Sequence, residues 1–153
     1  MSLLLEDART RPELFAWYGA IRTDDLDQWL HKRELPIPQD LTALWRDTGG
    51  GDIFETETLL APFGDPDKGD DVDGVNAMER SKGLPEGYLL FHTGLRQSAV
   101  RLSDGRYITF RPGSFEVEME FPSLEAWYEG LIRNEYAARY GLTVARHRSP
   151  VGG

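Results

Sequence analysis

The chain has no cysteine, three histidines and fewer basic than acidic residues. Without cysteine it forms no disulfide bond and offers no thiol nucleophile, which fits a reducing compartment. A zinc hydrolase needs several nitrogen or sulfur ligands, and only His31, His92 and His147 are present. We therefore expect no metal site and no cofactor.

Long hydrophobic runs are also missing. No apolar stretch in the sequence approaches the ~20 residues that a membrane-spanning helix requires. The N-terminus lacks the basic start and the apolar segment of a signal peptide. We expect a cytoplasmic protein that does not bind membranes.

Positive charge is scarce: 17 Lys and Arg stand against 26 Asp and Glu, a formal net charge of −9. Nucleic-acid binding draws its affinity from basic residues that neutralise phosphates, so no nucleic-acid partner is expected. A basic protein partner would be attracted by this net field. The simpler alternative is that acidity keeps a small protein soluble.

What is present is the composition of one globular domain. The chain has 153 residues, of which 40% are hydrophobic and 11% aromatic, enough for a self-sustaining core. We expect residues 1–141 to form a single domain. Residues 142–153 contain few apolar side chains and are predicted to be a mobile tail.

Helical spacing of apolar residues dominates the first third of the chain. Leu14, Trp17, Tyr18 and Ile21 predict one helix, and a second begins at Thr23. A third helix follows Pro38 and ends at Gly49, which is suited to a left-handed helix terminus. Another long helix is expected from Ser123, a capping residue, to Gly141.

Strand patterns dominate the middle of the chain. The expected strands are 53–60, 88–93, 98–102, 106–110 and 115–121, with a turn at 103–105. Residues 65–74 are too polar and glycine-rich for a packed element. The sequence thus predicts an α+β fold: a central, mainly antiparallel β-sheet covered by N-terminal helices and a long C-terminal helix.

Two groups of carboxylates are candidate contacts for a basic partner. The first is the acidic segment, formed by Asp65, Asp67, Asp70, Asp71 and Asp73. It fails the EF-hand register, because position 5 is Gly69 and position 12 is Asn76. A solvated loop is the simpler interpretation, and a weak nonstandard metal site stays open.

The second group is the glutamate row Glu116, Glu118 and Glu120, which alternates with apolar residues along one strand. A solvated face is the default interpretation of this row. Pairing with Arg96, Arg101, Arg106 and Arg111 on neighbouring strands would weaken its acidic character.

Catalytic motifs are not found. No serine lies in a Gly-x-Ser-x-Gly elbow, and no glycine-rich loop ends in Lys followed by Ser or Thr. His92, at a strand end, is expected to be a hydrogen-bonded structural histidine rather than a general base. The four tryptophans lie at helical spacing and are expected to fill the core.

Three segments in order resemble the SUKH superfamily, which contains the yeast cell-wall assembly regulator family and many bacterial immunity proteins. They are the proline-initiated helix with Trp45, Gly49 and Gly50, the Leu-Pro segment 84–91, and the strand-to-helix step 123–127. The resemblance covers roughly residues 14–140.

This resemblance implies a noncatalytic protein-binding domain. In bacterial members that is typically an immunity protein that occludes the active site of a polymorphic toxin, here a basic toxin domain. The alternative is a regulatory or scaffold domain that binds a host protein in signalling or cell-wall regulation. An enzyme with an unrecognised small-molecule site is the third hypothesis, and fold alone does not choose among the three.

Overall fold

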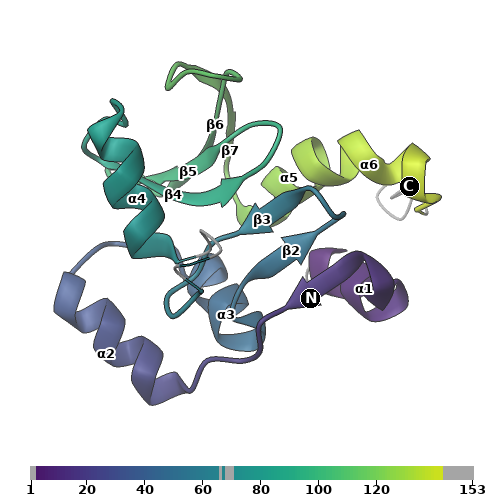
Figure 1. Ribbon diagram of the computed structural model, residues 1–153, viewed down its shortest axis with the longest axis horizontal. Coiled ribbons are helices and arrows are strands. Elements are labelled where there is room, and N and C mark those ends of the chain that lie inside the picture. Colours follow the sequence, from purple (N-terminus) through teal and green to yellow (C-terminus); the bar gives the residue numbers. More distant parts are fainter. Residues whose placement is uncertain (1–2, 66, 68–70, 143–153) are drawn as a thin grey trace.

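The computed structural model describes residues 3–65, 67 and 71–142 and shows one seven-stranded sheet with helices packed around it (Figure 1). Neighbours in the sheet follow chain order, and each neighbouring pair is antiparallel. The predicted α+β class is confirmed. The strands are β1 (Phe15–Trp17), β2 (Gly51–Ile53), β3 (Glu57–Leu59), β4 (Tyr88–Thr93), β5 (Ser98–Arg101), β6 (Arg106–Phe110) and β7 (Val117–Phe121).

The long C-terminal helix covers one face of this sheet. It consists of α5, a π-helical segment η3 and α6, and its Trp127 packs on Phe91 of β4 with ring centroids 4.8 Å apart. In Figure 1 this helix lies to the right of β4 and β5, and α4 lies to their left. The helical segments are α1 (Leu3–Thr10), η1 (Pro12–Leu14), α2 (Thr23–Arg33), α3 (Gln39–Thr48), α4 (Val72–Ser81), α5 (Leu124–Trp127), η3 (Tyr128–Arg133) and α6 (Asn134–Tyr140).

Helix ends follow the local chemistry expected from the sequence. Gly49 ends α3 at φ 72°, and its N–H donates to the Trp45 carbonyl at 2.8 Å. The Ser123 hydroxyl accepts from the Ala126 N–H at 3.1 Å and so caps α5. Gly141 ends α6 at φ 67°. These ends are set by short-range hydrogen bonds, which makes them visible in the sequence.

Gly49→Ala is expected to destabilise the fold by about 2–4 kcal/mol, because the left-handed conformation and overpacking both contribute. A Cβ on Gly49 would lie 2.0 Å from the Gly19 carbonyl oxygen. Gly113→Ala is the matched control, since Gly113 has φ 74° but open space around its Cβ position. Urea denaturation should give a clearly larger loss for Gly49→Ala; equal losses would contradict the steric contribution.

The helix predicted over residues 14–21 is wrong. Phe15 and Trp17 pair instead with Ile53 and Gly51, forming β1 at the edge of the sheet. The pairing depends on Gly51, where a Cβ would lie 2.1 Å from the carbonyl oxygen of Ala16. For this segment, pairing with the close backbone of β2 outweighs the helical preference that the spacing of its apolar side chains indicated. The neighbouring residues in the sequence give no indication of this pairing.

The single strand predicted over 53–60 is also wrong, because it is two strands joined by a tight turn. Phe54 and Glu55 hold positive φ values of 51° and 70° in that turn. Phe54 is fully buried and stacks on Tyr136 with ring centroids 5.2 Å apart. Burial of this ring offsets the left-handed backbone that a bulky residue rarely adopts.

Two helices were not predicted. α1 packs on the C-terminal helix, and α4 begins inside the segment expected to be unpacked, with Val72 fully buried. Asn76 of α4 pairs with the backbone of β4: its Oδ1 accepts from the Leu90 N–H at 2.7 Å and its Nδ2 donates to the Leu90 carbonyl at 3.0 Å. α4 thus covers the part of the β4 edge that β3 leaves free.

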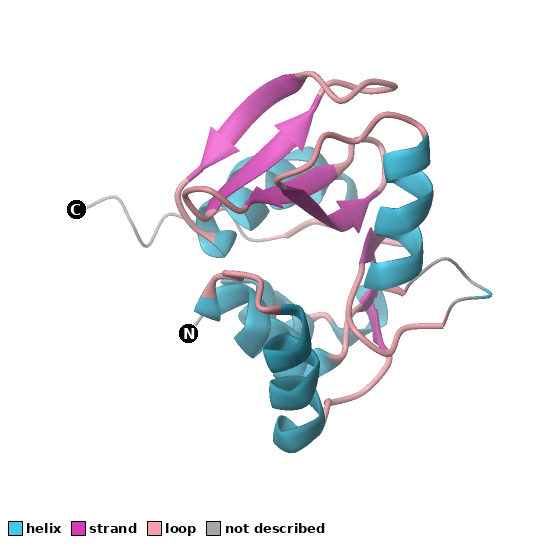
Figure 2. Cartoon of the chain, turned by 90° about the vertical axis from the view of Figure 1, so that its left-hand side faces the viewer, coloured by secondary structure: helices cyan, strands magenta, loops and turns pink. Residues whose placement is uncertain are grey.

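Both faces of the central strands are closed to solvent. Leu90, Ala99 and Ile108 on one side and Phe91 on the other are fully buried. Figure 2 shows the strands above α2, with the vertical helix α4 beside them. Neither face of these central strands is therefore open to a partner. Within the described residues, no helix combines the length and hydropathy needed to cross a membrane.

Candidate functional site

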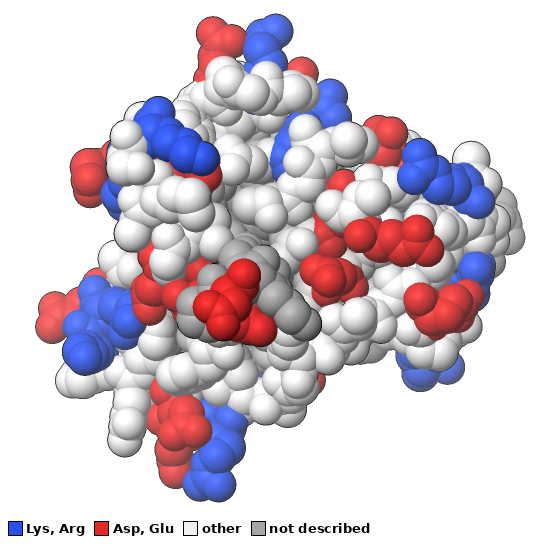
Figure 3. All heavy atoms as spheres, viewed as in Figure 1, with Lys and Arg blue, Asp and Glu red and all other residues white. Residues whose placement is uncertain are grey.

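The acidic segment divides into exposed and structural members. Asp67 is exposed, and Asp65 is half-buried and accepts the Asp67 N–H at 2.9 Å. Neither forms an ion pair within the described residues. Figure 3 shows carboxylates gathered near the centre of the viewed face. Asp70 lies outside the described residues.

The other two members of the segment are engaged by the fold. Asp71 is the N-cap of α4 and accepts from the Gly74 N–H at 2.9 Å. Asp73 pairs with Arg33 of α2 at 2.6 Å and accepts from the Trp29 Nε1–H at 3.2 Å. These two carboxylates hold α4 in place and fix it to α2, so they are less free to meet a partner.

The glutamate row is neutralised by arginines. Glu116 pairs with Arg111 at 2.8 Å, and Glu118 pairs with Arg96 at 2.8 Å. Glu120 contacts Arg101 and Arg106 at 3.0 and 3.1 Å, and the hydrogen bond from Arg101 holds the pKa of Glu120 below its ordinary value. The row therefore presents little net negative charge, as the arginine spacing had suggested.

A hollow with exposed aromatic side chains lies beside the acidic segment. It has a volume of about 290 Å³, and its lining includes Tyr18, Ile21 and Phe63. Tyr18 is 43% exposed and Phe63 is 60% exposed. Phe63 also has φ 67°, a conformation that costs a bulky residue roughly 1–2 kcal/mol. We call this the aromatic hollow; sequence periodicity assigned Tyr18 to a helix and so missed it.

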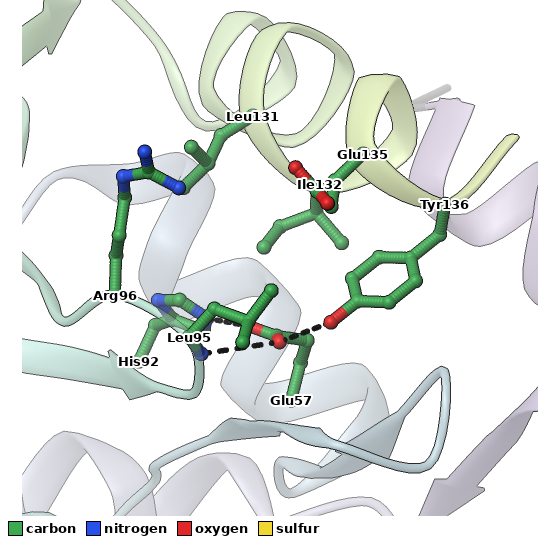
Figure 4. Close-up of a pocket in the computed structure, with 8 residues that line it drawn as sticks. All are labelled: Glu57, His92, Leu95, Arg96, Leu131, Ile132, Glu135 and Tyr136. Carbon is green, nitrogen blue, oxygen red and sulfur yellow. Dashed lines mark hydrogen bonds and ion pairs between the residues drawn. The ribbon is translucent and has the colours of Figure 1, made fainter. Parts of the chain in front are cut away.

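A buried polar cluster lies under the C-terminal helix. Glu57 of β3 contacts His92 of β4, with Oε1 and Nε2 2.6 Å apart (Figure 4). The Tyr136 hydroxyl of α6 donates to Glu57 Oε2 at 2.5 Å, and His92 Nδ1 lies 2.9 Å from the Ser98 hydroxyl. His92 and Ser98 are fully buried, and Glu57 is 2% exposed. Four elements, β3, β4, β5 and α6, thus share one hydrogen-bonded network.

The network fixes the ionisation of its carboxylate. Burial raises the pKa of Glu57, but hydrogen bonds from His92 and Tyr136 outweigh it and bring that pKa below the ordinary value. Burial and the bond to Glu57 raise the pKa of Tyr136 to about 12, so Tyr136 stays a donor. An ionised Glu57 only accepts, which means that His92 Nε2 carries a proton.

The order Glu57, His92, Ser98 matches the groups of a hydrolase triad, but the geometry does not support catalysis. Ser98 is fully buried, and its hydroxyl accepts from the Trp127 Nε1–H at 2.9 Å instead of facing an open site. The adjoining pocket has a volume of about 10 Å³, the space of one water molecule. The cluster therefore serves to join strands and helix.

A β-bulge places His92 in this cluster. Leu90 pairs with Ala99 and His92 pairs with Ser98, so Phe91 is an extra residue in β4. The extra residue turns His92 toward the face that Ser98 and Trp127 occupy. Simple alternation predicts the opposite face, which is why sequence reasoning found a structural histidine but not its partners.

Groups that hold metal ions are not found in the described part of the chain: no three His, Asp or Glu side chains there are arranged to share an ion. No protein-family model matches this chain, and no curated protein sequence matches it significantly. The SUKH resemblance therefore stays a prediction from the order of the sequence motifs.

Proposed function

We propose that this protein is a noncatalytic protein-binding domain that acts as an immunity protein, covering the active site of a basic toxin domain. The observation that carries the proposal is the aromatic hollow with its acidic neighbours. Exposed aromatic side chains are typical binding hot spots. Phe63 is 60% exposed in a left-handed conformation, so it contributes little to folding.

Charge complementarity supports a basic partner. Asp65 and Asp67 follow Phe63 in the chain and supply the negative charge, because Asp25 of the lining is paired at 3.8 Å with Arg22, which also lines the hollow. With a net charge of −9, the molecule attracts a cationic surface and raises the association rate. Acidic side chains at this rim would take the place of the toxin's anionic substrate.

The alternative is a regulatory or scaffold domain that uses the same surface for a host protein. It needs the same exposed aromatics but no basic partner and no toxin to inhibit. The closed Glu57–His92–Ser98 cluster supports either binding function over an enzyme, because His92 and Ser98 are fully buried.

Phe63→Asn is expected to weaken partner binding by about 2 kcal/mol, roughly 30-fold, while leaving stability equal or higher. Asparagine tolerates the left-handed conformation, so the variant removes the ring and relaxes the backbone. Affinity capture from a lysate of the source organism, with mass spectrometry and titration of the retained protein, measures the change in binding, and urea denaturation measures the change in stability.

Met78→Ser is the matched control, since Met78 is 50% exposed on α4, away from the hollow. The proposal is supported if the captured protein is a basic toxin domain that this protein inhibits at equal stoichiometry. The Met78→Ser variant should bind that toxin domain, and the Phe63→Asn variant should not. A retained regulatory protein favours the scaffold alternative. Equal retention by both variants contradicts the aromatic hollow as the binding surface.

A further inference from the structure

A larger pocket lies between α1, α3 and the start of α5, with a volume of about 380 Å³. This lies within the usual range for small-ligand sites. Its apolar wall includes Leu4, Leu44 and Leu124, which are all buried in the fold. The charged side chains of the lining are three carboxylates, Asp40, Asp47 and Glu125. No lysine or arginine lies among the lining residues.

Two of these carboxylates are held in place by the fold. Asp40 accepts the backbone N–H groups of Leu41 and Leu124, each at 2.9 Å, and the hydroxyl of Tyr107. Glu125 Oε1 accepts the Leu3 N–H at 2.8 Å. The positions of these oxygens are therefore preorganised, which lowers the entropy lost when a ligand binds.

Asp47 makes no such hydrogen bond to the part of the chain that the structure describes. It is exposed in the last turn of α3, where the helix dipole already produces a negative potential. A carboxylate at this position is unfavourable for the helix, and no ion pair within the described residues compensates it. A stability cost at a pocket rim is typical of a residue that serves binding.

We infer that this pocket binds a small organic ammonium ion with an apolar body. The apolar wall takes the body, and the ammonium group lies between Asp47 and Glu125, with Asp40 supplying further negative potential. Burial of the body provides most of the affinity, and the carboxylates discriminate against neutral and anionic analogues. This site is separate from the aromatic hollow and does not depend on the proposed immunity function.

Three matched probes test the inference on the full chain: tryptamine, its neutral alcohol analogue tryptophol, and the anion indole-3-propionate. Isothermal titration calorimetry should show saturable tryptamine binding, with tryptophol at least fivefold weaker and the anion weaker still. Amide shifts in NMR spectra should concentrate on α1, α3 and α5. Absence of saturable tryptamine binding, or equal affinity for all three probes, overturns the inference.

Asp47→Asn is expected to weaken tryptamine binding by about 1.4- to 5-fold, as for loss of one exposed ion pair, while the melting temperature stays equal or rises. Asp27→Asn on exposed α2 is the matched control and should bind tryptamine like the wild type. Ala43→Phe, which fills the pocket from a half-buried helix position, should weaken binding at least tenfold. Unchanged affinity in Asp47→Asn contradicts the role of the carboxylates.

Discussion

Glu57→Ala is expected to lower the free energy of unfolding by about 3–5 kcal/mol, the usual loss when one partner of a buried polar pair is removed. His92 would lose its Nε2 acceptor at 2.6 Å and Tyr136 its acceptor at 2.5 Å. Both donors would lose a charged acceptor in the core. Urea denaturation at neutral pH, followed by tryptophan fluorescence, measures the loss.

The same carboxylate makes stability depend on pH. The pKa of Glu57 lies below its ordinary value of 4.5 in the folded protein. Its stabilising contribution is therefore fully present above pH 4.5 and is lost as the pH falls through the folded pKa. Unfolding curves of the wild type and Glu57→Gln between neutral pH and pH 3 should converge toward the acid end.

Glu86→Ala is the control for this experiment, because Glu86 is exposed near the start of β4. Its stability should stay within about 0.5 kcal/mol of the wild type, as at most surface positions. Two results would mean that the cluster does not hold the fold together. The first is that the stability of the wild type and of Glu57→Gln changes in parallel with pH. The second is that Glu57→Ala lowers the free energy of unfolding by less than about 1 kcal/mol.

Asp7→Ala is expected to cost a similar amount, about 3–5 kcal/mol, because it leaves a buried charge without its partner. Asp7 and Arg133 are each 5% exposed, and Asp7 Oδ2 accepts from Arg133 Nε at 2.7 Å. The same oxygen accepts from the Tyr128 hydroxyl at 2.6 Å. Asp7 is thus the polar contact that fixes α1 to the π-helical segment η3.

A double-mutant cycle with Arg133→Met isolates the pair. Asp7→Ala combined with Arg133→Met should be more stable than Asp7→Ala alone, because an apolar replacement leaves no unpaired charge. Thermal unfolding and urea denaturation of the four proteins give the coupling free energy. A coupling near zero would show that α1 is held by its leucines rather than by this ion pair.

Elements governed by neighbouring residues were predictable. The α3 helix ends at Gly49 because a glycine there takes φ 72° and bonds back to Trp45, and Ser123 caps α5 through its own hydroxyl. The strands 88–93 and 106–110 were predicted at their observed bounds. In each case the signal is a short-range hydrogen bond or an apolar run within a few residues.

Elements that depend on distant partners were not predictable. β1 forms because β2 offers a glycine backbone 34 residues later, measured from Trp17 to its partner Gly51. α4 has a local cap in Asp71, but it begins inside the polar, glycine-rich segment 65–74, and its packing is fixed at a distance, where Asn76 pairs with the backbone of β4. The spacing of apolar residues can be read from a single sequence. The segment against which a strand or helix will pack cannot.

By itself the sequence determined the α+β class, several helix caps, the central strands and an acidic net charge of −9. The tertiary structure alone decided which carboxylates are paired: Asp73 and Glu118 form ion pairs with arginines, whereas Asp65 forms none with the residues that the structure describes. It also decided that His92 meets Glu57, through a bulge in β4, and that Phe63 is exposed. The reason is that ionisation, exposure and pairing are set by neighbours in space, which come from segments far apart in the chain.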